Sequence, residues 1–389
     1  MNGKINILIY PLWYEEEWNQ GRTYQKVAEH LAKRPDVRKV ICVFPKREPK
    51  APYSWPIKII KESPKLTLLS TFTQCVPTNT APFRLRRWVN KHIDQLCRLY
   101  LHLQGFGEKN TIRWYFPPLT ETPQLNDIYP ACMTVSQIVD NFLVADTKSP
   151  LYTAAHEQYP LLANRSNLII TGSNPMFEYF SQLNSNTCLM ENATDDAFIA
   201  PCTELPCKSG TQKPRLGYIG FISNRTDLDL LSAIARHYPQ YQLIIAGPLH
   251  DVTEEQFLSL SSLPNVNHLG PIAYNLLPDL ISSFDICLLP HKDTPLSRSM
   301  SPLKFFQYLG SGRPIVSTKI GGINRFSQHT YIAENTDEFI QMIDTALTTR
   351  TKEKSQQQIE AAKLETWDTR IEIVFNQVQL HLQKNNQIK

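Results

Sequence analysis

A short segment near residue 300 combines a lysine with the signals that begin a helix. Ser301 is expected to cap the helix, and Pro302 fits its first position because the N–H that proline lacks would be unpaired there. Lys304 lies in the first turn, where free N–H groups and the positive end of the helix dipole favour an anion. Gln307 shares a face with Lys304. The segment predicts an anion site, with Gln307 or Tyr308 touching whatever the anion carries; the alternative is an ordinary capped surface helix.

The same segment also carries signals for the end of the helix and for a following strand. Gly312 can adopt the left-handed conformation that ends a helix, and Pro314 prevents the helix from continuing. Residues 315–318 form an apolar, β-branched run. We therefore expect the order loop, helix, strand.

The second half of the chain alternates short apolar runs with helical patterns, which predicts a doubly wound parallel sheet. In such a sheet, ligands bind beyond the carboxyl ends of the strands. No G-x-G-x-x-G motif follows the first run, which argues against a dinucleotide-binding dehydrogenase. The expected strands are 215–220, 241–248, 266–270, 285–290 and 315–318.

Several candidate ligand-binding residues follow these expected strands. Gly220 and Gly247 would form turns that let a ligand approach the backbone closely. Arg225 lies in the loop after the first strand, where it can bind phosphate through two N–H groups, or can simply be solvated beside Asp227. His291 follows the strand at 285–290; it can contact the ligand or be a loop residue without a role.

The first half of the chain has a similar pattern, beginning with a strand at 5–10, a helix at 23–34 and a strand at 39–44. Asp140 follows a further strand at 133–139, so it is placed where ligands bind in open α/β sheets. A carboxylate there can accept a proton from an acceptor hydroxyl, or it can cap the next loop.

A basic amphipathic helix is predicted over residues 83–103. Apolar residues recur at spacings of three and four, and arginine and lysine residues lie between them. Such a helix can lie on an anionic membrane surface, or it can cover a sheet and expose its basic face to solvent.

Length and composition indicate a two-domain globular protein. The chain has 389 residues, with 42% hydrophobic and 20% charged residues. Its net charge of +4 is too small to indicate a nucleic-acid partner. Eight scattered cysteines indicate a reducing compartment, and the one close pair, Cys202 and Cys207, lacks the further ligands of a metal site. We therefore expect no bound metal. Because no 18-residue apolar run exists, we also expect a cytoplasmic protein, which can still contact the cytoplasmic face of the membrane peripherally.

The expected domain boundaries follow composition and pattern. Residues 1–200 form the first domain, the proline-rich stretch 201–214 is a linker, residues 215–366 form the second domain, and a helix over 367–389 returns to the first.

The segment around Lys304 resembles the donor-site signature of nucleotide-sugar glycosyltransferases with the two-domain GT-B fold. The likeness is closest to the bacterial exopolysaccharide and teichuronic-acid branch, in which the pattern P-x-K-x-x-E-Y-L-x-x-G-x-P-V-V-S-T recurs. Gln307 departs from this pattern because the family usually has Glu there, and the related pattern with a second Glu eight positions earlier meets Ser299. The matching residues are Pro302, Lys304, Tyr308, Leu309, Gly312, Pro314, Val316, Ser317 and Thr318.

The likeness covers nearly all of residues 216–322 and is patchy in the first domain. Tyr274 lies in a stretch that resembles the family's G-x-x-x-Y and would border the nucleotide base. Residues 135–141 resemble the family's V-Y-D-x-V-D-D segment, and residues 189–198 resemble the end of its first domain. Residues 366–370 resemble the S-W-x-x-R at which the last helix crosses back.

The resemblance implies two Rossmann-like domains that face a cleft, with the acceptor bound by the first and the donor by the second. The implied reaction moves a sugar from a UDP- or GDP-linked donor to a hydroxyl of a glycan or lipid-linked saccharide, without a bound metal. Lys304, Arg225 and the helix start would stabilise the leaving diphosphate, and Gln307 would bind the ribose hydroxyls. Asp140 would act as the base.

Two alternatives to this enzyme remain open at this point. Gln307 is compatible with a non-catalytic relative that keeps the fold and binds a nucleotide or a partner. A sugar-nucleotide epimerase on the same architecture is the other alternative.

Overall fold

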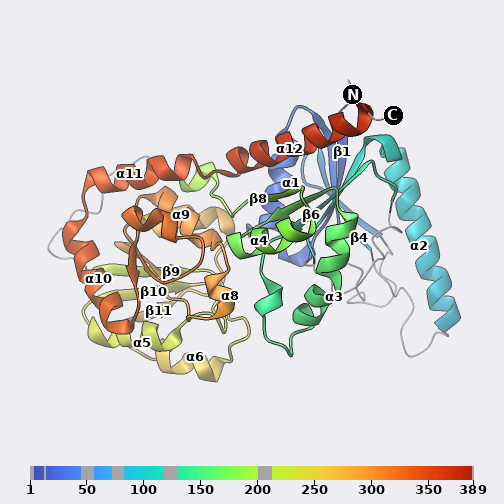
Figure 1. Ribbon diagram of the computed structural model, residues 1–389. Helices are drawn as coiled ribbons and strands as arrows, with labels where there is room; N and C mark the ends of the chain where they lie inside the picture. The colour runs from blue at the N-terminus through green and yellow to red at the C-terminus, as the bar shows by residue number, and fades with distance from the viewer. Residues whose placement is uncertain are drawn as a thin grey trace. The chain divides into compact units, whose positions relative to one another are not determined.

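The computed structural model describes residues 4–12, 15–44, 57–71, 83–117, 129–199 and 213–387 (Figure 1). The chain forms two compact units, here called unit 1 (Met1–Met190 with Ile371–Lys389) and unit 2 (Glu191–Arg370). Most of the stretch expected to be a linker, 201–214, lies outside the described residues, as do Cys202 and Cys207.

Unit 1 is built on a sheet in which eight described strands follow the order β3-β4-β2-β1-β5-β6-β7-β8. All neighbouring pairs are parallel except β3 and β4, which are antiparallel. The central strand β1 is buried along its whole length, as its continuous apolar sequence requires. The strands are β1 (Ile5–Tyr10), β2 (Val37–Val43), β3 (Ile57–Lys61), β4 (Leu66–Thr71), β5 (Thr111–Tyr115), β6 (Met133–Ile138), β7 (Leu168–Thr171) and β8 (Thr187–Leu189).

Helices cover this sheet, and the last helix of the chain joins them. The described helices of unit 1 are α1 (Thr23–Lys33), α2 (Phe83–Leu103), α3 (Pro150–Arg165), α4 (Asn174–Leu183) and most of α12 (Trp367–Gln387). The guanidinium of Arg34 lies 4.3 Å from the ring centre of Phe375, and Gln379 of α12 donates to Asp36 at 2.7 Å. The predicted return of the C-terminal helix to the first domain is confirmed.

Unit 2 contains a parallel sheet in which six described strands follow the order β11-β10-β9-β12-β13-β14. They are β9 (Arg215–Ile219), β10 (Gln242–Ala246), β11 (Val266–His268), β12 (Ile286–Leu289), β13 (Ile315–Thr318) and β14 (Tyr331–Ala333). Its described helices are α5 (Leu228–His237), α6 (Glu254–Ser261), α7 (Leu277–Ser282), α8 (Pro295–Arg298), α9 (Leu303–Ser311), α10 (Thr336–Thr349) and α11 (Lys352–Lys363).

Successive side chains of this sheet point to opposite faces and pack into two separate hydrophobic cores, one on each face. Leu216, Tyr218 and Leu288 pack with α5, α6 and α10, whereas Ile219 and Leu289 pack with α7, α9 and α11. A parallel sheet with helices packed on both faces is the doubly wound arrangement that the sequence predicts, so this prediction is confirmed.

Residues 191–199, which the sequence places at the end of the first domain, pack within unit 2. Phe198 belongs to the core beneath α9. The backbone N–H of Asn192 donates to the hydroxyl of Ser301 at 3.2 Å, and its side-chain amide donates to the Ser301 carbonyl at 2.6 Å. Because this segment bonds to the residues just before α9, unit 2 begins near residue 191.

A cluster of four charges joins the first and last segments of unit 2. Arg325 donates to Glu191 at 2.8 Å and to Glu365 at 2.7 Å, and Arg370 also donates to Glu365. The backbone repeats the connection, because Thr194 N–H donates to the Glu365 carbonyl at 2.9 Å. The two carboxylates are largely buried, so their partners offset a substantial desolvation cost.

Candidate functional site

The order of strands in unit 2 marks one place for a ligand. From β9 the chain proceeds outward to β10 and β11, then returns to the other side of β9 as β12. The loops after β9 and β12 therefore leave neighbouring parallel strands in opposite directions, and such switch points form ligand-binding crevices at the carboxyl edge of a sheet.

Lys304 lies at this switch point, against the end of β9. Its ammonium donates to the hydroxyl of Tyr218 at 2.8 Å and lies 4.3 Å from the centre of the Tyr218 ring. A Cβ at Gly220 would lie 2.9 Å from Lys304 Nζ, so only glycine leaves room for the lysine in this position. The backbone at Gly220 also has a φ of +111°, which L-amino acids rarely adopt. Lys304 is half-buried, and its charge is held at the strand end.

Tyr218 is a residue that the sequence reading missed. It is fully buried in β9, where it looks like an ordinary core aromatic. Its hydroxyl accepts from Lys304, donates to the Phe221 carbonyl at 2.8 Å and lies 3.2 Å from Thr226 Oγ1. The tyrosine therefore ties Lys304 to the loop that carries Arg225. The one feature of the sequence that could have identified it is the hydroxyl of a tyrosine placed two residues before a glycine that ends a strand.

The second predicted glycine turn holds the ends of β9 and β10 together. Gly220 N–H donates to the Ala246 carbonyl at 2.8 Å, and Gly247 N–H donates to the Gly270 carbonyl at 2.8 Å. A Cβ at Gly247 would lie 2.0 Å from the Gly220 carbonyl oxygen, and the φ of Gly247 is +148°. Gly247 therefore permits a backbone contact that any other residue would break.

His291 and Arg225 belong to the same switch point. The Lys292 N–H donates to the Arg225 carbonyl at 2.9 Å, which joins the loop after β12 to the loop after β9. The His291 N–H donates to Thr318 Oγ1 at 3.0 Å, which fixes the backbone beneath the ring. Burial, Lys304 and Arg225 together lower the pKa of His291 well below its usual 6.5.

The imidazole of His291 is the notable polar group of this cluster. The residue is only 5% exposed, and neither ring nitrogen has a hydrogen-bond partner among the described residues. Asp227, the acidic neighbour of Arg225 in sequence, uses its carboxylate to cap α5 by accepting from Leu230 N–H at 2.9 Å. The site thus combines two cations with a neutral imidazole.

The start of α9 differs by one residue from the sequence prediction. The N-cap is Pro302, without a side-chain cap, and the helix proper begins at Leu303. Ser301 does not cap the helix because its hydroxyl and carbonyl accept from Asn192, more than a hundred positions earlier in the chain. Gly312 ends the helix with a φ of +65°, as predicted. Lys304 still lies in the first turn.

The two other predicted site residues of α9 differ in whether their polar groups already have a hydrogen-bond partner. Gln307 is 4% exposed, and its amide forms no hydrogen bond within the described part of the chain. Tyr308 is fully buried, and its hydroxyl accepts from Ile219 N–H at 2.8 Å, at the end of β9. Tyr308 therefore supports the strand end, and its expected contact with a ligand does not fit this position.

Tyr274, expected beside the base, is half-buried in unit 2. Its hydroxyl donates to the carboxylate of Asp195, and its ring lies edge-on to Phe198 with centroids 5.3 Å apart. These contacts fix the ring against the segment 191–199.

Asp140 lies in unit 1, directly after β6. Its carbonyl accepts from Phe142 N–H at 3.1 Å, and the next turn is capped by Asn141, whose side chain accepts from Leu143 N–H at 3.2 Å. Asn141 thus caps this turn, and both roles expected for the Asp140 carboxylate, base or loop cap, stay predictions. The carboxylate is half-buried at the carboxyl edge of the sheet.

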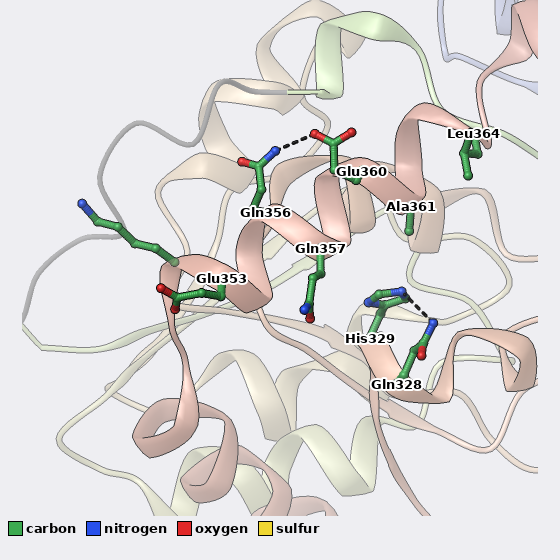
Figure 2. Close-up of a pocket in the computed structure, with 9 residues that line it drawn as sticks. Gln328, His329, Glu353, Gln356, Gln357, Glu360, Ala361 and Leu364 are labelled. Carbon is green, nitrogen blue, oxygen red and sulfur yellow. Dashed lines mark hydrogen bonds between the residues drawn. The ribbon is translucent and has the colours of Figure 1, made fainter.

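A large hollow of unit 2 lies at the opposite edge of its sheet. It has a volume of about 970 Å³, and Figure 2 shows Gln357 of α11, His329 and Gln328 among the residues that line it. His329 and Gln328 lie just before β14 begins, so this hollow belongs to the amino edge of the strands. Size alone does not identify the site; the strand ends, where Lys304 and His291 lie, satisfy the rule for open α/β sheets. Within the described residues, no group of three or more His, Cys, Asp or Glu is placed to hold a metal ion.

Comparison with known proteins agrees with this geometry. Residues 213–349 match the family described as Glycosyl transferases group 1. A protein of Bacillus subtilis (strain 168) named as a teichuronic acid biosynthesis glycosyltransferase, TuaH, is 28% identical over 148 residues. That aligned stretch spans 37% of this chain and 37% of TuaH.

Solved structures share the fold over nearly the whole chain. Sucrose-phosphate synthase from Thermosynechococcus elongatus has a TM-score of 0.70 at 14% identity, covering 98% of this chain and 100% of that one. Anabaena HepE, solved with UDP and glucose, has a TM-score of 0.65 at 14% identity, covering 96% and 99%. WaaG, a glycosyltransferase involved in lipopolysaccharide biosynthesis, has a TM-score of 0.59 at 14% identity, covering 95% and 98%.

The chain therefore has the GT-B fold, and its residues 213–349 match the glycosyltransferase family. The family match includes Lys304, Arg225 and His291 and covers most of the described part of unit 2. The predicted fold class is confirmed, and the family match agrees with the predicted family of enzymes over residues 213–349.

Proposed function

We propose that the protein transfers a sugar from a nucleoside diphosphate donor, UDP- or GDP-linked, to a hydroxyl of a glycan or lipid-linked saccharide. The C1–oxygen bond to the diphosphate breaks, and its electron pair goes to the phosphate oxygen. The acceptor oxygen bonds to C1, and its proton passes to a base, for which Asp140 is the candidate. The TuaH match and the HepE structure with UDP and glucose support this class of donor and acceptor.

The observation that carries the proposal is the position of Lys304. Leaving-group departure places negative charge on the diphosphate, and a cation fixed beforehand stabilises that charge without reorganisation. Lys304 is held at the strand end by Tyr218, in the first turn of α9, whose free N–H groups add to the positive field. Arg225 supplies a second cation, so we propose that no metal ion is required.

Gln307 has a proposed role next to these cations. Its amide is buried on α9, three residues after Lys304, and would bond to the ribose hydroxyls of the nucleotide. An amide forms a weaker bond than a carboxylate, by about 1 kcal/mol.

The test measures release of nucleoside diphosphate from a panel of UDP- and GDP-sugars with acceptor lipid extracts, with and without a chelator. The expected result is release from one donor class that needs the acceptor and persists with the chelator. A thermal-shift screen of nucleotides identifies the donor base first, because a ligand that binds only the folded state raises the Tm. Release from no donor, with no nucleotide raising the Tm, would contradict the proposal.

The replacement of Glu by Gln307 favours a second candidate, a non-catalytic protein that retains nucleotide binding. Calorimetric binding of a nucleotide sugar without release in any acceptor extract would support it. NMR of the donor alone would reveal the third possibility, an epimerase, through a changed sugar signal.

We further propose that α2 places unit 1 on an anionic membrane surface, where a lipid-linked acceptor would be found. Leu96, Leu99 and Leu103 are 51%, 53% and 72% exposed, at the spacing of one helix face. The sequence of α2 is strongly basic, with four arginines and one lysine against one aspartate, which complements anionic lipid. Figure 1 shows α2 (cyan) along one side of unit 1. Within the described residues, no helix has both the length and the apolar character needed to cross a bilayer.

A further inference from the structure

His291 is a buried imidazole for which the folded chain provides no hydrogen-bond partner. The residue is 5% exposed, and both ring nitrogens lack a partner among the described residues. Buried polar groups are nearly always paired, so an orphan at a ligand site indicates that a bound group completes it. The backbone of His291 is fixed by Thr318 on one side and by a bridge to Thr226 on the other. The backbone that carries the ring is therefore fixed.

The charges that act on this ring are positive. Lys304 on α9 and Arg225 in the loop after β9 both disfavour the imidazolium, and burial disfavours it further. The neighbouring carboxylates are engaged elsewhere: Asp227 caps α5, and Asp293 pairs with Arg298 at 2.6 Å. Two further charged residues are Lys292, which follows His291 in sequence, and Lys319, which follows Thr318 and pairs with Glu334 at 3.3 Å.

We propose that His291 takes up a proton when a nucleoside diphosphate binds, so that its imidazolium becomes a third cation for the diphosphate. This inference rests on the proposed function, because it uses the same donor site. The diphosphate brings at least two negative charges to Lys304 and Arg225, which reverses the local field, and its oxygens supply the acceptor that the ring lacks. Since burial and these cations hold the pKa of the free imidazole well below 6.5, the ring is neutral near pH 7 before binding.

The sign of the expected pH dependence follows from this change. A group that gains a proton on binding makes the affinity fall as pH rises, because deprotonation favours the free state. Between the pKa of the free ring and that of the complex, the Kd should rise by up to about tenfold per pH unit. The phosphate group titrates as well, so the informative quantity is the difference between wild type and a variant that lacks the imidazole.

The experiment is calorimetry of the nucleoside diphosphate chosen by thermal shift, at pH 7, in two buffers with different ionisation enthalpies. The dependence of the heat on the buffer gives the number of protons taken up. Wild type should take up nearly one proton more than His291→Gln. The matched control His237→Gln, an exposed histidine at the end of α5, should give the wild-type value.

A second measurement does not depend on the folding of a variant. In wild type, NMR of the labelled imidazole nitrogens should show one buried ring change from neutral to protonated when nucleotide is added. Equal proton uptake by wild type and His291→Gln, or no ring that changes its protonation, would overturn the inference while leaving the donor site intact. Absence of any nucleotide binding would overturn both.

Discussion

Replacing Gly220 by alanine tests how Lys304 is held at the site. The new Cβ would lie 2.9 Å from Lys304 Nζ and 3.0 Å from Cε, so the lysine must give way. The end of a lysine side chain moves at little steric cost, but it then leaves the Tyr218 hydroxyl, now 2.8 Å away. The backbone cost is separate: a φ of +111° strains an alanine by about 1–3 kcal/mol.

The expected result for Gly220→Ala is therefore twofold. Stability to urea should fall by about 1–3 kcal/mol, and nucleoside diphosphate should bind about tenfold or more weakly, because a charge-assisted contact contributes about 1.5–3 kcal/mol. Gly270→Ala is the matched control: its φ is +66°, and no heavy atom lies within 4 Å of its added Cβ. It should lose stability through strain alone and bind nucleotide normally. Wild-type affinity in Gly220→Ala, or an equal loss of affinity in Gly270→Ala, would refute this reasoning.

Three further predictions concern the charge cluster, the surface helix and the nucleotide contact. Arg325→Ala should destabilise the protein by about 1–3 kcal/mol in urea unfolding, because it leaves buried carboxylates underpaired. Burial raises the pKa of Glu365, but the hydrogen bond from Arg325 helps to bring that pKa below 4.5. The difference in unfolding free energy between wild type and Arg325→Ala should therefore narrow as pH falls below 4.5, and it should not change with pH near neutrality. Leu99→Glu should reduce co-sedimentation with anionic vesicles severalfold, whereas Leu258→Glu, on an exposed leucine of α6, should not. Gln307→Glu should lower the Kd for nucleotide about fivefold if the side chain bonds to ribose, and unchanged calorimetric affinity would count against that contact.

The sequence predicted the local elements of the site well. Residues 301–318 carry their own start, stop and apolar signals, so helix α9, its left-handed end at Gly312 and strand β13 were all foreseeable. The strand ends bearing Gly220, Gly247 and His291 were foreseeable for the same reason, since continuous apolar runs end at glycine or proline. These features depend on neighbours within a few residues.

Features that depend on distant residues were not foreseeable. Ser301 does not cap the helix because its hydroxyl accepts a hydrogen bond from the Asn192 N–H, and no residue near Ser301 in sequence indicates that contact. Tyr218 is chemically indistinguishable in sequence from other buried strand aromatics, and its contact with Lys304 spans 86 positions. The three-residue strands β8 and β14 show no period and were missed, whereas β11, of the same length, was expected within the longer run 266–270.

The antiparallel pairing of the edge strand β3 was not predicted. Its residues are half-exposed, as an edge position allows, but its sequence does not record the direction in which it pairs with β4. Strand order likewise depends on long-range pairing, and it is the order β10-β9-β12 that creates the switch point where the site lies.

The affinity of the Lys304→Met protein for UDP and GDP tests the central claim most directly. Methionine keeps the length of the side chain and removes the charge, and Lys363→Met, on an exposed lysine of α11, is the control. We predict that the Kd of the responsive nucleotide, measured by calorimetry, rises about tenfold to a hundredfold in Lys304→Met and stays at the wild-type value in Lys363→Met. A folded Lys304→Met protein that binds both nucleotides as wild type does would show that this lysine does not hold the diphosphate.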